Sequence, residues 1–200
     1  RGLGDVYKRQ GRPMAGHLIA AGHEVHLHRV KDISRPLVEA GGHEAASAKA
    51  VAESADIIIV MVPDTPDVEA VLFGEDGVAA GLGAGKTVVD MSSISPVATQ
   101  AFAARIAELG CAYLDAPVSG GEAGAKAASL SIMVGGAQAD FDKLLPVFEV
   151  MGKNITLVGD VGAGQTAKIA NQIIVALTIG AVSEGCLLYT SPSPRDRQKS

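Results

Sequence analysis

Short apolar runs alternate along this chain with longer segments in which apolar residues recur every three or four positions. The apolar runs predict β-strands at 24–28, 56–62, 87–90, 112–118, 130–134 and 155–158. The segments between them predict helices at 12–21, 45–54, 66–72, 96–109 and 139–151. Alternation of strands and helices at this spacing predicts an α/β fold with a doubly wound, mainly parallel sheet.

The pattern changes at Gln165, after which residues 165–185 continue as one helical run. The length of this run predicts the start of a helical second domain, most of which is expected to lie outside the sequence. We therefore expect a first domain at 11–163 and the start of a second domain at 164–185.

The two ends of the chain can be encoded by one DNA element read in opposite orientations. A back-translation of residues 1–10, taken as its reverse complement and shifted by one base, encodes residues 186–194. That element resembles the transposase adapter used to build sequencing libraries. We therefore expect 1–10 and 186–200 to be non-native and set them aside. The first domain is then expected to lack its first strand, and the glycines of the opening RGLG to match a dinucleotide-binding loop by accident.

Composition and charge limit the classes of partner and the cellular environment that we expect for this chain. The net charge is −5 and no basic run occurs, which argues against nucleic acid as the main partner. With the C-terminal segment set aside, Cys111 is the single cysteine, which suits a cytoplasmic protein, and we expect it to be a small buried core residue. The longest apolar stretch, 169–182, is interrupted by Asn171 and Gln172, so we expect no membrane span.

Gly11 stands where a helix is expected to open, with Pro13 near its first turn. In a dinucleotide-binding unit the last glycine of the glycine-rich loop lies at such a point, and the pyrophosphate rests on the helix N-terminus. A plain helix-start glycine is the alternative interpretation.

Arg29 follows the strand expected at 24–28, at the position where an acidic residue would bind the adenosine ribose and favour NAD. An arginine there can pair with a 2′-phosphate, so this position favours NADP. The alternative is a solvated arginine at a strand end. The nearby His23, His26 and His28 alternate too weakly to indicate a metal site, so no metal is expected.

Two further candidate segments follow strands. The stretch from Met61 through Val62 to Pro63 ends a buried strand, at the edge of the sheet where ligands bind in open α/β folds. Ser93 follows the strand expected at 87–90, and its hydroxyl could meet the cofactor or cap a helix. Ser95 is the better candidate for capping the helix that starts at 96.

Ser119, Gly120 and Gly121 follow the strand expected at 112–118. Small residues let backbone N–H groups turn toward an anion such as a substrate carboxylate. An ordinary glycine turn is the alternative interpretation.

Lys168 and Asn171 lie three residues apart and therefore share one face of the predicted long helix. A lysine in the first turns, near apolar neighbours, is poorly placed against the helix dipole, so we expect its pKa to be lowered toward a value suited to a general acid. An exposed helix lysine is the alternative.

The motifs GRPMAGHLIAAGH, IIIVMVPDTPDVEAVLFG, VVDMSSISP, LDAPVSGGEAGA and GAGQTAKIANQIIVAL resemble, in this order, those of the β-hydroxyacid dehydrogenases. The resemblance covers nearly all of 11–185 and implies a Rossmann domain followed by a helical one. It implies that Lys168 is catalytic with Asn171 beside it, that Ser119, Gly120 and Gly121 bind a substrate carboxylate, and that Gly11, Val62, Pro63 and Ser93 lie along the cofactor.

The resemblance implies reduction of a small carboxylated aldehyde with NAD or NADP by an enzyme that forms a homo-oligomer. Members of the family differ in substrate, and the residues that separate them are expected to lie largely outside this sequence. A nucleotide-binding module without chemistry is the alternative of another class, against which the pair Lys168 and Asn171 argues. The 200-residue chain itself is expected to be inactive, because the first strand and most of the helical domain are expected to lie outside it.

Overall fold

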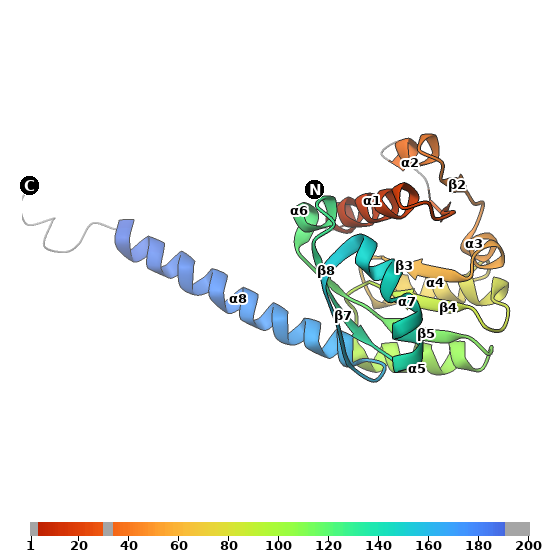
Figure 1. The fold of residues 1–200 in the computed structure, drawn as a ribbon. Coiled ribbons are helices and arrows are strands. Elements are labelled where there is room, and N and C mark those ends of the chain that lie inside the picture. Colours follow the sequence, from red (N-terminus) through yellow and green to blue (C-terminus); the bar gives the residue numbers. More distant parts are fainter. Residues whose placement is uncertain (1–3, 30–33, 191–200) are drawn as a thin grey trace, which may run out of the picture. The chain divides into compact units, whose positions relative to one another are not determined.

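The computed structural model describes residues 4–29 and 34–190 of the chain (Figure 1). It divides into two units, the first ending at Lys168 and the second beginning at Ile169. The first unit is an α/β domain, and the described part of the second is the continuation of one long helix.

The main sheet of the first unit is built from six strands, whose spatial order across the sheet is β3-β4-β5-β7-β6, with β8 also paired to β7. The strands are β3 (Ile57–Val60), β4 (Thr87–Asp90), β5 (Ala112–Asp115), β6 (Val118–Ser119), β7 (Leu130–Gly135) and β8 (Gly152–Gly159). The pairs β3–β4, β4–β5 and β7–β8 are parallel, which confirms the mainly parallel sheet expected from the sequence.

The antiparallel steps of the sheet lie at β7, which pairs with β5 and β6 in the opposite direction. Only residues 120–129 join β6 to β7, fewer than the dozen or so that a parallel crossover needs. The predicted strand at 112–118 is accordingly two strands, since the chain leaves β5 at Asp115 and pairs again as β6.

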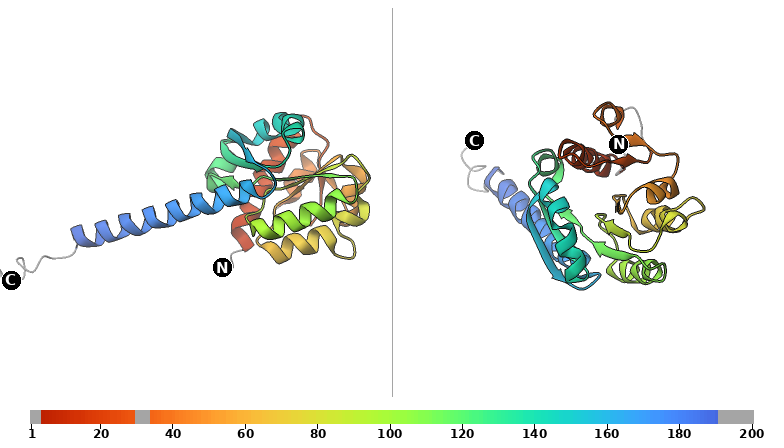
Figure 2. Two further views of the ribbon diagram at one scale, coloured as in Figure 1. Left: turned by 90° about the horizontal axis from the view of Figure 1, so that it is seen from below. Right: turned by 45° about the vertical axis from the view of Figure 1, so that its right-hand side comes forward.

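Helices cover both faces of the main sheet (Figure 2). They are α1 (Gly4–Ala20), α2 (Arg35–Glu39), α3 (Ala48–Ser54), α4 (Thr65–Phe73), α5 (Pro96–Ala107), α6 (Gly121–Lys126), α7 (Gln138–Met151) and α8 (Ala163–Thr190), with a 3₁₀ turn at Val78–Gly81. Side chains of α3, α4 and α5 share one buried cluster, whereas those of α1 and α7 share the other.

The continuous apolar run of β3 explains how one strand serves both cores. Successive side chains of a strand point to opposite faces of the sheet. Ile58 and Val60 are buried with α3, α4 and α5, and Ile57 and Ile59 pack against the cluster of α1 and α7. The prediction of a strand buried on both faces is confirmed for the face of Ile58 and Val60 and only in part for the other, where Ile57 and Ile59 also line a cavity.

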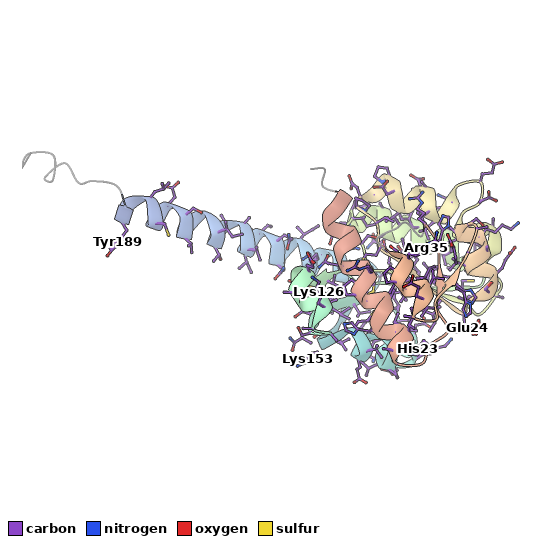
Figure 3. The ribbon with its side chains drawn as sticks, turned by 90° about the horizontal axis from the view of Figure 1, so that it is seen from above. His23, Glu24, Arg35, Lys126, Lys153 and Tyr189 are labelled. Carbon is purple, nitrogen blue, oxygen red and sulfur yellow. The ribbon has the colours of Figure 1, made fainter. Side chains whose placement is uncertain are left out.

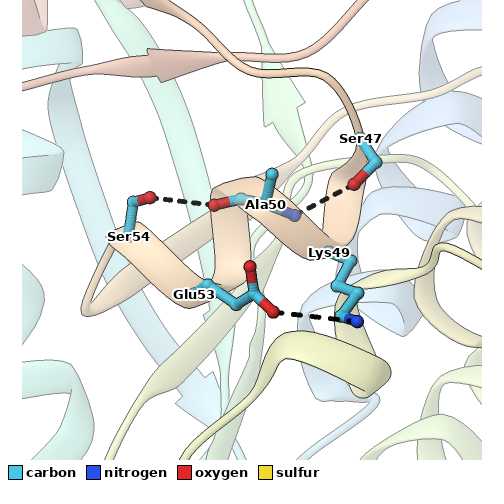
Figure 4. Close-up of polar contacts among 5 residues, drawn as sticks. All are labelled: Ser47, Lys49, Ala50, Glu53 and Ser54. Atoms are coloured by element: carbon cyan, nitrogen blue, oxygen red, sulfur yellow. Dashed lines mark hydrogen bonds and ion pairs between the residues drawn. The ribbon is translucent and has the colours of Figure 1, made fainter.

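Serine side chains form hydrogen bonds that cap the starts of two helices. Ser95 Oγ accepts a bond from the Ala98 N–H at 3.4 Å, which confirms the predicted cap of α5. At α3 the Ser47 hydroxyl accepts from the Ala50 N–H at 3.1 Å, and Lys49 pairs with Glu53 one turn later at 3.8 Å (Figure 4).

The strand expected at 24–28 is only partly confirmed. It forms β1 (His26–Leu27), which pairs in parallel with β2 (His43–Glu44) in a separate two-stranded sheet. A cavity of about 740 Å³ is lined by apolar side chains of both β1 and β3. Among the described residues no strand lies between β1 and β3, so the doubly wound sheet is interrupted at this cavity.

Helix α8 passes from the first unit into the second. Its stretch Ala163–Leu187 is long and apolar enough to cross a membrane by length and composition, a test that core helices of other proteins also pass. No membrane span was expected from the shorter stretch 169–182, and that expectation stays a prediction. Within the second unit Ile174 and Leu177 are exposed, as is Tyr189 near the helix end (Figure 3). Such a helix is apolar on most of its surface.

Candidate functional site

The carboxyl ends of the three parallel strands β3, β4 and β5 are aligned. Val60 lies opposite Asp90 in the register of β3 with β4, and Asp90 lies opposite Asp115 in the register of β4 with β5. Segments that follow these strands therefore emerge at one edge of the sheet, the edge where open α/β sheets bind ligands.

A buried polar network joins the ends of β3 and β4. The Val62 N–H donates to Ser92 Oγ at 3.0 Å, and the Ser92 N–H donates to Asp90 Oδ1 at 2.9 Å. The Tyr113 hydroxyl donates to Asp90 Oδ2 at 3.1 Å. Burial raises the pKa of Asp90 above its ordinary value, and the bonds from Ser92 and Tyr113 partly offset that rise.

Asp115, at the end of β5, holds the beginning of α8. Its Oδ1 accepts the Gly162 N–H at 2.7 Å, and its Oδ2 accepts the Gln165 N–H at 2.8 Å. The residue is fully buried, and burial raises its pKa while these backbone bonds lower it in part. A carboxyl group supplied by a strand thus satisfies N–H groups that the helix start leaves without an intrahelical acceptor.

Lys168 lies in the first turns of α8 with 9% of its surface exposed. Burial lowers its pKa below the ordinary lysine value, in the direction expected from the sequence. The interpretation as an exposed helix lysine is therefore wrong. Asn171 follows one turn later in the second unit, where its Nδ2 donates to Gln172 Oε1 at 3.3 Å.

The cavity beside β3 brings together most of the predicted cofactor residues. Its lining includes Gly11, Arg29, Met61, Val62 and Pro63. His23, which follows α1 in the chain (Figure 3), also lines the cavity. Arg29 is exposed and has a φ of 61°, which a residue with a side chain adopts uncommonly.

The expected position of Gly11 at a helix N-terminus is wrong. Helix α1 begins at Gly4 and contains Pro13 in its interior. Residues 8–10, Lys-Arg-Gln, are good helix formers, so the helix extends back past Gly11. Pro13 removes one backbone hydrogen bond but does not end the helix here. The Gly11 N–H therefore lies inside a helix, although Gly11 itself lines the cavity.

Ser93 and the glycine turn do not lie on the cavity. Ser93 is half-buried after β4. Ser119 pairs with Ser131 within the sheet, and Gly120 and Gly121 turn the chain into α6 with φ values of 134° and 61°. Those left-handed conformations favour glycine, which supports the interpretation as a turn and leaves the carboxylate role a prediction.

Sequence reasoning missed Asp90, Ser92, Asp115 and Gln165 as parts of this site. The available signal was a single aspartate at the end of each buried strand, in TVVD and AYLD, where an ionisable residue needs a buried partner. Cys111 was placed correctly, because it is buried and its thiol lies 3.1 Å from the Gly83 carbonyl oxygen. Among the residues described, no His, Cys, Asp or Glu cluster suited to a metal ion occurs.

The raised pKa values of Asp90 and Asp115 predict a pH dependence of folding. Each carboxyl group binds protons more readily in the folded chain than in the unfolded chain, so lowering the pH toward about 4 stabilises the fold and raising it removes that stabilisation. We expect Asp90→Asn to lose less free energy of unfolding than the parent chain as the pH rises from about 4 to 7. Urea denaturation at several pH values measures the free energy of unfolding of both proteins. The same change of this free energy with pH in the two proteins would contradict the prediction.

Comparison with known proteins gives a family match and several relatives. Residues 8–159 match the model described as the NAD binding domain of 6-phosphogluconate dehydrogenase. The chain is 55% identical over 186 residues to the 2-hydroxy-3-oxopropionate reductase of Escherichia coli (strain K12), which covers 93% of this chain and 63% of that relative. The chain thus spans less than two thirds of that relative's length.

Solved structures agree in fold. The Mycobacterium tuberculosis 3-hydroxyisobutyrate dehydrogenase with L-serine superposes with a TM-score of 0.83 at 33% identity, covering 91% of this chain and 62% of that one. Psf3 in complex with NADP⁺ and 2-OPP superposes with a TM-score of 0.80 at 29% identity, covering 100% of this chain and 70% of that one.

Proposed function

This chain belongs to the β-hydroxyacid dehydrogenase family and carries its NAD-binding domain, and from that premise we propose that the intact protein is an NAD(P)H-dependent reductase that converts 2-hydroxy-3-oxopropionate (tartronate semialdehyde) to D-glycerate. The observation that carries the reductase proposal is the burial of Lys168 in the first turns of α8, anchored at the carboxyl edge of the sheet by Asp115 and Gln165. The choice of substrate is supported by the 55% identity to a reductase of that substrate.

The residues around the cavity fit one part of a dinucleotide. Arg29, Val62 and Pro63 line the cavity at strand ends, as residues at the ribose end of such a cofactor would. The pyrophosphate part is not matched by Gly11, since that residue lies inside α1. When bound, the cofactor supplies the hydride that reduces the carbonyl carbon.

The chain's own residues supply the proton and the orientation. Lys168 donates a proton to the oxygen of the carbonyl as that oxygen becomes an alkoxide, and its ammonium group stabilises the developing charge. Asn171, on the same helix, orients the lysine and the substrate. Ser119 and the backbone N–H groups of Gly120 and Gly121 hold the substrate carboxylate, so that the carbonyl is presented in one orientation. After turnover the lysine regains its proton from solvent.

The proposed domain organisation follows the same premise. Residues 11–163 form the dinucleotide-binding domain, and 164–185 begin a helical domain that covers the exposed apolar side chains of α8 in the intact protein. The ends 1–10 and 186–200 are proposed to be adapter translations, and the cytoplasmic, homo-oligomeric state remains a prediction.

Two other substrates of the family are alternatives, namely 3-hydroxyisobutyrate and succinic semialdehyde. The structural likeness to a 3-hydroxyisobutyrate dehydrogenase favours the first of them. A nucleotide-binding module without chemistry is the alternative of another class.

A panel assay of the intact protein tests the proposal. Initial rates would be measured for 2-hydroxy-3-oxopropionate and succinic semialdehyde with NADH and NADPH, and for 3-hydroxyisobutyrate in the oxidative direction. We expect the highest kcat/KM for 2-hydroxy-3-oxopropionate. A higher value for another substrate would replace the substrate and keep the reaction class, whereas nucleotide binding without any turnover would favour the non-catalytic module.

Arg29 provides a test of cofactor choice. Replacing Arg29 by alanine in the intact protein should raise the KM for NADPH by about ten- to a hundredfold, because a charge-assisted bond to the 2′-phosphate is lost. The KM for NADH should change little. Arg35→Ala is the matched control, since Arg35 is exposed on α2 and does not line the cavity (Figure 3). Equal effects on both cofactors would contradict this role for Arg29.

A further inference from the structure

The first turn of α8 is capped by a side chain from a distant part of the sequence. Asp115 accepts N–H bonds from Gly162, which lies 47 residues later in the chain, and from Gln165. Helix starts are usually capped by the residue just before them. Here the cap belongs to strand β5, so the position of the helix start is set by the sheet.

Gln165 makes a second connection, to the segment that follows β4. Its Oε1 accepts the Ile94 N–H at 3.1 Å, and its Nε2 donates to the Ser92 carbonyl at 2.8 Å. The side chain is 1% exposed. Because both ends of the amide are bonded, the side chain has one orientation, and the helix cannot rotate about its axis without breaking a buried bond.

Two glycines pack closely around the Asp115 carboxyl group that caps α8. A Cβ at Gly164 would lie 2.4 Å from the Met133 carbonyl oxygen and 2.8 Å from Asp115 Oδ2. A Cβ at Gly135 would lie 2.5 Å from Asp115 Oδ1. The helix start is thus packed against backbone on two sides and cannot slide along the sheet.

These contacts determine where Lys168 lies. Residues three apart on a helix are neighbours on one face, so Lys168 follows Gln165 on the face that meets the end of β4. We propose that Asp115 and Gln165 are positioning residues for Lys168, fixing the height and rotation of the first turns of α8 so that the lysine is directed to the carboxyl ends of β4 and β5. The inference rests on the proposed function, in which Lys168 is the proton donor.

Gln165→Met tests the inference, because methionine has a similar length and volume and forms neither bond. In the 200-residue chain we expect the amide hydrogens of residues 162–168 to exchange about tenfold faster, as the loss of the Gln165 bonds implies. We also expect the pKa of Lys168, followed by NMR of its side chain, to rise toward the ordinary lysine value. Gln138→Met, an exposed glutamine at the start of α7, is the matched control and should change neither quantity.

Gln165→Asn is the second variant, should Gln165→Met fail to fold. It keeps an amide but is one methylene shorter, so it cannot reach both partners and should release the helix start in the same way. If Gln165 only fills space, Gln165→Met would retain the exchange rates and the lysine pKa of the parent chain, and the inference would be overturned. Faster exchange with an unchanged lysine pKa would also overturn it, since the bonds would then hold the helix without positioning the lysine.

Neither readout requires turnover, so the two proposals fail separately. Activity retained in a Lys168 variant of the intact enzyme would refute the proton-donor role and leave the exchange and titration results standing. Unchanged exchange and titration would refute the positioning role alone.

Discussion

Lys168→Ala in the intact enzyme is expected to lower kcat by about a hundred- to ten-thousandfold, the range that a positioned general acid contributes. Alanine can neither donate the proton to the developing alkoxide nor stabilise its charge. The affinity for the nucleotide should stay unchanged, because Lys168 does not line the cavity that Arg29 and Pro63 line. Stopped-flow or steady-state rates measure the first effect, and equilibrium titration of the nucleotide measures the second.

Lys153→Ala is the matched control for that experiment. Lys153 lies on β8 with an exposed side chain (Figure 3), so its removal should leave kcat unchanged. Near-normal turnover of Lys168→Ala would defeat the role proposed for this lysine. If nucleotide binding and turnover were both lost, the result would instead indicate that the substitution disturbs the domain.

Gly164→Ala is expected to destabilise the first unit by about 3 kcal/mol or more, at the upper end of what overpacking costs. The added methyl group would meet the backbone oxygen of Met133 and the carboxyl of Asp115, neither of which can move without breaking a strand pair or the α8 cap. Urea denaturation followed by circular dichroism gives the change in free energy of unfolding.

Gly180→Ala is the control, since it makes the same change in the same helix where nothing lies within 4 Å of the new methyl group. It should be neutral or stabilise α8 by up to about 1 kcal/mol, because alanine is the better helix former. Similar stabilities for the two variants would show that the contacts around Gly164 can relax.

The sequence predicts most of the first unit because its elements are marked by strong local patterns. The strand at 87–90 has the predicted bounds, and the cap at Ser95 forms the predicted bond. The short elements β2, α2 and α6 were not predicted, since each is too short for a periodic pattern and depends on its neighbours.

Only part of the candidate site was predicted from the sequence, because some of its residues come together only in the folded chain. The lowered pKa of Lys168 was predicted from its place in the first turns of a helix, and the structure buries this lysine on the helix face that it shares with Gln165. The partners that position that helix, Asp115 and Gln165, are far apart in sequence, and only the fold brings them together. The misplaced helix start at Gly11 has the opposite cause, because local helix propensity there extends α1 past the glycine.

The cavity between β1 and β3 also affects how the chain behaves in solution. Within the described part of the chain, β1 pairs on one side with β2, and β3 pairs on one side with β4, so the other edge of each has no strand partner there. Exposed strand edges are templates for pairing between molecules. Concentration-dependent aggregation through β-pairing is therefore the hazard to control when this chain is expressed and purified.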